Sequence, residues 1–160
     1  MTRVMVIGNA GGGKSIISRA LAVAHGLPYH AIDQIQWQPN WVPLPEDEGY
    51  RIHEGLLGQA RGLIDGYGSW SSVERRLAVA DTVIFVDHPL WLHYWWASKR
   101  QIGSLFRERP DGPAGCPMFP VTFRLFRMMW WLHREMRPRL LAAIEARRET
   151  MRVIHIRSPK

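Results

Sequence analysis

An eight-residue stretch near the start of the chain, GNAGGGKS at residues 8–15, has the composition of a phosphate-binding loop. It satisfies the spacing G-x-x-x-x-G-K-[S/T] through Gly8, Gly13, Lys14 and Ser15. Glycine allows backbone conformations that turn several N–H groups toward an anion, and a helix N-terminus adds positive potential. Lys14 would reach the β- and γ-phosphates, and the Ser15 hydroxyl would ligate Mg²⁺. We therefore predict a nucleotide-phosphate site made of Gly8, Asn9, Ala10, Gly11, Gly12, Gly13, Lys14 and Ser15.

Three aspartates follow apolar runs that read as parallel strands, and ligands of open α/β sheets bind at that carboxyl edge. Asp65 ends GLID and would order the water shell of Mg²⁺. Asp87 ends TVIFVD in a second Walker-B-like position and is a further candidate metal contact. Asp33 ends the run at 27–32, near where a phosphoryl acceptor should lie. Aspartate also favours helix caps and turns, which is the alternative for all three.

Phosphoryl transfer needs positioned positive charge more than covalent chemistry. Arg75 and Arg76 follow the strand-like LIDG and could clamp a phosphate; we place Arg75 with the catalytic groups and Arg76 with the acceptor. Arg100, Arg107 and Arg109 flank a proline- and glycine-rich excursion, which we interpret as a lid at about 107–120. Of these three, Arg107 would act on the transition state and the other two on the nucleotide. Solvated surface arginines are the better interpretation for at least half of the five.

The chemical class of the phosphoryl acceptor depends on the role of Asp33. A hydroxyl acceptor benefits from a carboxylate near the proton it loses, whereas a phosphate acceptor needs arginines and no base. The chain offers both sets. Trp37 and Trp41, in the proline-rich loop after Asp33, could supply an apolar wall or a stacking surface for an aromatic base.

The elements around these residues alternate between strand and helix. A buried strand is predicted at 3–7, a helix at 16–24 ended by Gly26, and further strands at 27–32, 62–65, 82–87 and 152–156. Helices are predicted at 46–60, 72–79, after Pro89 and along the apolar stripe 125–136, with Pro138 separating the last from its successor. The pattern indicates an α/β fold with a mainly parallel sheet in a single domain over residues 1–160.

Bulk properties limit the class of protein. The 160 residues carry a formal charge of +7 and one cysteine, Cys116, so a reducing cytoplasm is the default location. The seven histidines show no metal-ligand spacing. No stretch approaches the roughly 20 apolar residues that span a bilayer, and we expect no membrane partner.

Four longer stretches, HAIDQIQWQPNW, LIDGYG, ERRLAVADTVIFVDHP and RPDGPAGCP, resemble the family of DNA topology modulation proteins FlaR, relatives of adenylate kinase. The resemblance covers nearly the whole chain. It implies a P-loop NTPase fold with a five-stranded parallel sheet in the order 2-3-1-4-5, flanked by helices and a short lid. It also implies ATP and Mg²⁺. The chain departs from the family pattern at Asn40, where glycine is frequent, and at Tyr67.

Two functional hypotheses remain. The first is an ATP-dependent phosphotransferase of the adenylate kinase-like type, acting on a nucleotide, nucleoside or similar small metabolite. The second is a nucleotide-binding regulator that affects DNA topology or transcription with little or no kinase activity. Arginines at 124, 127, 134, 137 and 139 favour DNA binding, but no reader motif such as a helix-turn-helix accompanies them.

Overall fold

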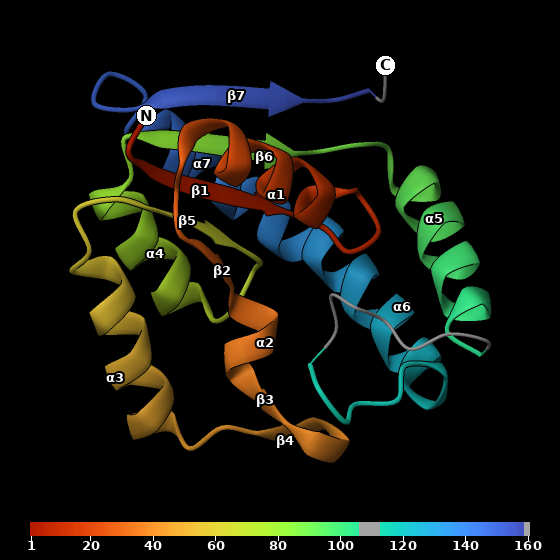
Figure 1. The fold of residues 1–160 in the computed structure, drawn as a ribbon. Coiled ribbons are helices and arrows are strands. Elements are labelled where there is room, and N and C mark those ends of the chain that lie inside the picture. Colours follow the sequence, from red (N-terminus) through yellow and green to blue (C-terminus); the bar gives the residue numbers. More distant parts are fainter. Residues whose placement is uncertain (106–112, 159–160) are drawn as a thin grey trace.

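A five-stranded parallel sheet forms the centre of the molecule in the computed structural model, which describes residues 1–105 and 113–158 (Figure 1). Its strands lie in the order β2-β5-β1-β6-β7, and every neighbouring pair is parallel. Counted along the chain, this is the order 2-3-1-4-5, so the predicted sheet is confirmed. The strands are β1 (Arg3–Gly8), β2 (Tyr29–Ala31), β5 (Gly62–Asp65), β6 (Thr82–Val86) and β7 (Arg152–Ile156).

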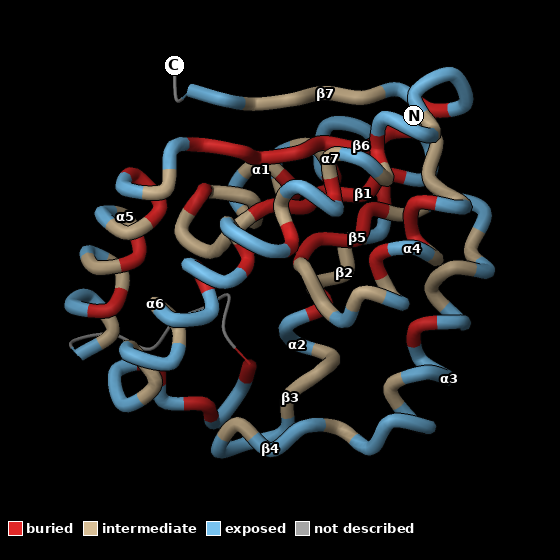
Figure 2. Tube along the Cα trace, turned by 180° about the vertical axis from the view of Figure 1, so that it is seen from behind, coloured by how far each residue is buried: buried red, intermediate tan, exposed pale blue. Residues whose placement is uncertain are grey.

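Helices cover both faces of the sheet because side chains alternate along each strand. Met5 and Ile7 of β1 point into a core shared with the helices α4 and α7. Val4 and Val6 point the other way, into a core shared with α1. Figure 2 shows β1, β5 and β6 buried along most of their length. The helices are α1 (Lys14–His25), α2 (Ile32–Gln36), α3 (Glu46–Leu57), α4 (Trp70–Val79), α5 (Leu90–Gly103), α6 (Thr122–Trp131) and α7 (Arg137–Glu145).

Short elements complete the chain. An antiparallel pair, β3 (Trp37–Gln38) and β4 (Val42–Pro43), encloses a 3₁₀ turn at Pro39–Trp41. A second 3₁₀ turn, Phe119–Val121, leads into α6. None of the helices in residues 1–105 and 113–158 has the length and apolar character needed to cross a bilayer.

Two sequence-based boundaries were wrong. β2 ends at Ala31, so Asp33 lies in the first turn of α2 and not at the end of a strand. α3 ends at Leu57, with Gly58 as its C-cap. Pro138 lies at the start of α7, as predicted, and the chain passes from α6 to α7 through a π-helical turn at Leu132–Met136. Proline has no N–H to donate, and the wider turn precedes the residue that cannot continue the usual ladder.

Candidate active site

The glycine-rich loop joins β1 to α1 at the carboxyl edge of the sheet. Gly8, Gly11 and Gly13 have φ values of 150°, 80° and 77°, a region that L side chains rarely adopt. At Gly8 a Cβ would lie 2.1 Å from the carbonyl oxygen of Val86, and at Gly11 2.5 Å from that of His93. Backbone conformation therefore favours glycine at all three positions, and the close approach of β6 and α5 also requires it at Gly8 and Gly11.

The N-terminus of α1 faces this loop. Gly13 is the N-cap, and no side-chain cap within the described residues bonds to the first turn. Lys14 extends back across the loop, and its Nζ donates to the carbonyl oxygen of Asn9 at 2.7 Å. The amides of a helix N-terminus and an adjacent ammonium group together form a site for a polyphosphate.

Two side chains hold the loop from outside. Asn9 Nδ2 donates to the carbonyl oxygen of Met129 in α6 at 2.8 Å, and Asn9 Oδ1 accepts from the N–H of Ala10. His93 of α5 is buried, with its Nδ1 2.9 Å from the carbonyl oxygen of Ala10. A carbonyl only accepts, so His93 Nδ1 carries the proton. Sequence reasoning missed His93, since nothing in its local spacing points to residue 10.

Burial of His93 makes the stability of the protein depend on pH. Burial, with Lys14 and His88 nearby, outweighs the hydrogen bond to Ala10 and lowers the pKa of His93 from 6.5 to about 4. The unfolded chain therefore binds more protons than the native protein between these two values, and stability rises with pH across that window. We expect His93 alone to lower the free energy of unfolding by up to about 3 kcal/mol as the pH drops from 6.5 to 4. Urea denaturation at a series of pH values measures this.

His93→Gln keeps a hydrogen-bond donor without titrating, so it should remove about that much of the pH dependence. His53 is also buried, and desolvation with Arg76 and Arg75 lowers its pKa to about 4. The double variant His93→Gln/His53→Gln should flatten the profile further. A wild-type profile that is flat between pH 4 and 6.5 would contradict a neutral, buried His93.

Asp65, Tyr29 and Ser15 form a cluster beside the loop. Asp65 is 3% exposed, and Tyr29 Oη donates to its Oδ2 at 3.2 Å. The Ser15 side chain is a second hydrogen-bonding partner of Tyr29, and burial together with the Asp65 charge raises the pKa of that phenol. Asp65 Oδ1 is buried with no hydrogen-bond partner among the described residues. A buried carboxylate oxygen without a donor, close to a hydroxyl, fits a hydrated Mg²⁺ between Ser15 and Asp65.

Asp33 lies next to this cluster. Ala31 of β2, two residues before Asp33 in the chain, pairs in register with Asp65 of β5. This pairing brings Asp33 near Asp65. A Cβ on Gly66 would lie 3.5 Å from Asp33 Oδ1, so the Asp33 carboxylate borders the turn that follows Asp65. Asp33 is exposed whereas Asp65 is buried. The structure thus brings together two of the three predicted aspartates, one open to solvent and one enclosed.

The third aspartate is engaged elsewhere. Arg137 donates to both oxygens of Asp87, from Nε at 2.6 Å and from Nη2 at 2.8 Å, and His155 Nε2 lies 2.8 Å from Oδ2. Burial alone would raise the pKa of Asp87, but these hydrogen bonds outweigh it and lower the pKa. Asp87 and Arg137 line a small pocket with Gly8, Asn9, Tyr67 and His133. With its oxygens bonded to two side chains, Asp87 is a poor candidate for a metal contact.

The two arginines of α4 also have partners. Arg76 is 1% exposed, and its guanidinium group donates to the carbonyl oxygens of Ser72, Gly66 and Tyr67. Desolvation lowers the pKa of Arg76 to about 10, so it remains a cation at neutral pH. It supports the turn after Asp65. Arg75 pairs with Glu54 of α3 and lies 4.5 Å from the centroid of the Tyr50 ring.

The two most particular motifs of the sequence meet in a structure that we call the clasp, residues 37–43 with residues 113–118. The N–H of Asn40 donates to the carbonyl oxygen of Gly115 at 2.9 Å, and Trp41 Nε1 donates to that of Pro117 at 2.8 Å. Cys116 is buried, and its Sγ donates to the carbonyl oxygen of Gln38. The φ of Asn40 is 63°, consistent with a position where glycine is frequent.

Trp37 and Trp41 lie against each other in the clasp, with ring centroids 5.7 Å apart. Arg124 of α6 lies 5.7 Å from the Trp37 ring. Arg107 and Arg109 fall outside the described residues, and so does the first half of the predicted lid. Arg100 lies on α5 and is half-buried. Among the described residues, no three His, Cys, Asp or Glu side chains converge as a metal site.

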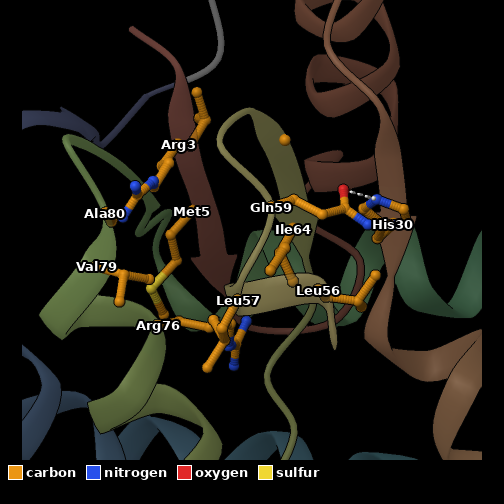
Figure 3. Close-up of a pocket in the computed structure, with 12 residues that line it drawn as sticks. Arg3, Met5, His30, Leu56, Leu57, Gln59, Ile64, Arg76, Val79 and Ala80 are labelled. Carbon is orange, nitrogen blue, oxygen red and sulfur yellow. Dashed lines mark hydrogen bonds between the residues drawn. The ribbon is translucent and has the colours of Figure 1, made fainter. Parts of the chain in front are cut away.

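A second pocket lies at the opposite edge of the sheet (Figure 3). It is lined by Arg3 and Met5 at the start of β1, by Leu56 and Leu57 of α3, and by Val79 near the end of α4. His30 and Gln59 bond to each other on its rim, with 3.3 Å between Nε2 and Oε1. Ligands of parallel sheets bind at the carboxyl ends of the strands, so this pocket is not part of the candidate site.

Comparison with known proteins identifies the fold. No model of a known protein family matches the chain, and no curated protein does. Among solved structures, shikimate kinase from Acinetobacter baumannii matches with a TM-score of 0.56 and 18% identity, covering 100% of this chain and 85% of that one. A sugar kinase from Janibacter sp. HTCC2649 matches with a TM-score of 0.54 and 18% identity over 99% and 88% of the two chains. A gluconokinase from Sinorhizobium meliloti 1021 matches with a TM-score of 0.54 and 17% identity over 99% and 83%. The chain therefore shares the α/β fold of these three structures.

Proposed function

We propose that the protein is an ATP-dependent phosphotransferase that acts on the hydroxyl group of a small metabolite. The observation that carries this proposal is the group at the carboxyl edge of the sheet. There a glycine cradle with Lys14, the half-buried pair Ser15 and Tyr29 beside the buried Asp65, and the exposed Asp33 adjoin one another. A donor site, a metal site and a base for an acceptor are the three parts that phosphoryl transfer to a hydroxyl requires.

The residues divide the chemistry as follows. The loop amides and Lys14 bind the phosphates of ATP and balance the charge that develops during transfer. Mg²⁺, held by Ser15 and through water by Asp65, would supply further positive charge to the phosphate oxygens. The oxygen of the acceptor hydroxyl bonds to the γ-phosphorus as the bond to ADP breaks, and Asp33 accepts the proton that the hydroxyl loses. Tyr29 orients the Asp65 carboxylate through its hydrogen bond.

The choice of a hydroxyl acceptor over a phosphate acceptor rests on the arginines. Arg75 pairs with Glu54, and Arg76 is buried against backbone carbonyl oxygens, so the two cations predicted to clamp a phosphate are engaged elsewhere. Asp33 is exposed beside Asp65. The named neighbours, which are kinases of shikimate, gluconate and a sugar, point the same way.

We also propose that the chain belongs with the FlaR proteins it resembles. The support is the clasp, in which the Asp-x-x-x-Trp-x-Pro-x-Trp block and the Gly-Cys-Pro turn bond to each other across about 75 residues of chain. That contact gives a physical reason for both motifs to occur in one sequence.

The test of function is an acceptor panel with ATP and Mg²⁺, comparing polyols and sugar acids with nucleosides and nucleoside monophosphates by ADP release. No product from any hydroxyl acceptor would overturn the proposal.

Tyr29→Phe tests the metal cluster. Removing the phenol leaves Asp65 Oδ2 without its donor, and loss of such an orienting partner costs about 10- to 100-fold in metal affinity. We therefore expect the Mg²⁺ concentration that gives half-maximal activity to rise about tenfold, with kcat at saturating Mg²⁺ close to wild type. Tyr94→Phe is the matched control, because Tyr94 Oη donates to the carbonyl oxygen of Phe126 in α6 and not to the metal cluster. Equal Mg²⁺ dependence in both variants would count against the cluster.

A further inference from the structure

Helices α5 and α6 lie side by side and run in opposite directions (Figure 1). Tyr94 and Phe126 form the contact between them: Tyr94 Oη donates to the carbonyl oxygen of Phe126 at 3.1 Å, and the two rings are 5.3 Å apart. The residue after each of these, Trp95 and Arg127, lies about 100° further round its helix. Because the helices are antiparallel, those rotations turn both side chains to the same side of the pair.

Exposed aromatic rings occupy that side. Trp91 and Trp95 share one face of α5 and are 68% and 54% exposed. Phe123 and Trp130 share one face of α6 with Arg127 and are 78% and 51% exposed. Single exposed apolar residues are ordinary, but four large rings on one two-helix surface mark an interaction site. We call this surface the aromatic face: Trp91, Trp95, Phe123 and Trp130 with the cations Lys99, Arg127 and Arg134.

The charge of the aromatic face is positive throughout. α5 and α6 contain no aspartate or glutamate. Lys99 Nζ lies 4.7 Å from the centroid of the Trp95 ring, and the Arg134 guanidinium carbon lies 5.8 Å from that of Trp130. Indole rings beside cationic side chains are the composition that lies in the headgroup region of an anionic bilayer.

Two other partners fit this face less well. A second copy docked across a two-fold axis would bring the same cations together, because none of the seven residues that define the aromatic face is acidic. A single-stranded nucleic acid needs open ring faces on which bases can stack, but Lys99 and Arg134 lie over the rings of Trp95 and Trp130. We propose that the aromatic face binds the surface of an anionic membrane. This inference does not depend on the proposed kinase activity.

Such binding would leave the phosphate loop accessible. The residues of α5 and α6 that contact the loop, His93 and Met129, are buried on the side opposite the aromatic face. The contact is peripheral, since no described helix is able to span a bilayer. The sequence-based expectation of no membrane partner rested on the lack of a spanning segment, and a peripheral contact needs none.

The test is co-sedimentation of the whole protein with vesicles of phosphatidylcholine alone or doped with phosphatidylglycerol. We expect binding to the anionic vesicles, little binding to the neutral ones, and a decrease as salt is raised. Trp91→Ser/Trp95→Ser should lower the partition coefficient at least about tenfold. Lys99→Glu/Arg127→Glu should lower it by about tenfold or more.

Matched variants separate this face from general effects. Arg51→Glu/Arg148→Glu changes the net charge equally at exposed positions elsewhere, and Ile16→Ser/Val23→Ser removes two exposed apolar side chains from α1. Both should bind vesicles as wild type does. Equal binding to neutral and anionic vesicles, or no loss in the Trp91/Trp95 variant, would overturn the proposal. So would self-association in light scattering, or oligonucleotide binding in fluorescence anisotropy, that this variant abolishes while vesicle binding persists.

Discussion

Replacing Lys14 with alanine is expected to lower kcat/KM for phosphoryl transfer by about 10³-fold or more. The Lys14 ammonium group lies across the loop on the carbonyl oxygen of Asn9, within the cradle formed by the glycines. Its removal takes a full positive charge from the position where the transferred phosphoryl group would develop negative charge. ADP release with the acceptor identified by the panel measures the change, and ATP binding is measured separately by thermal shift.

The control for this variant is Lys99→Ala, assayed without vesicles. Lys99 is exposed on α5, so the substitution also removes one lysine charge but leaves the loop intact. Thermal unfolding without ligand should be similar for the two variants, because Lys14 is only half-buried and lies outside both hydrophobic core clusters. If Lys14→Ala transfers phosphate at the wild-type rate, the nucleotide site is misassigned.

Replacing Asp33 with asparagine is expected to lower kcat about 10²- to 10⁴-fold with a hydroxyl acceptor. The amide has nearly the same shape as the carboxylate but cannot take up the hydroxyl proton. Asp33 is exposed in the first turn of α2, so stability should change little. Steady-state kinetics with the acceptor varied at saturating ATP separate kcat from KM.

Two comparisons make the Asp33 result specific. Asp47→Asn, at an exposed position in the first turn of α3, should leave kcat unchanged. Slow ATP hydrolysis without acceptor should persist in Asp33→Asn, since water brings its own proton acceptors. A higher KM with unchanged kcat would show that Asp33 binds the acceptor and is not the base. Loss of activity in Lys14→Ala but not in Asp33→Asn would keep the nucleotide site and reject the proposed proton transfer.

Much of the fold follows from patterns that are local in the chain. The runs at 4–7 and 83–86 are continuously apolar because a central parallel strand is covered on both faces. Gly26 was predicted to end the first helix, and it is the left-handed C-cap of α1 with a φ of 58°. The sheet order came from the family resemblance and is confirmed. The boundary errors occurred where local signals are weak, as at the three-residue strand β2, where aspartate suits a strand end and a first helical turn equally well.

The candidate site also contains residues that local sequence places and residues whose surroundings depend on distant parts of the chain. Loop residues 8–15 lie together because they are consecutive, and Asp65 and Asp33 lie close together because parallel register aligns the ends of β2 and β5. Arg76 and Asp87 have the residue types for phosphate and metal binding, but burial and distant partners engage them. Arg137 reaches Asp87 across 50 residues of chain, and His155 reaches it across 68.

Spacing along the chain is therefore enough to specify the phosphate cradle and the edge of the sheet at which chemistry would occur. Its physical basis is short-range, in the conformational freedom of glycine and the alternation of buried strands with amphipathic helices. The tertiary structure alone decides which charged groups remain able to bind a ligand, because a side chain can be buried or bonded by partners from anywhere in the chain. That is why Tyr29 and His93 enter the site without a sequence signal, and why the rings of α5 and α6 form one exposed surface.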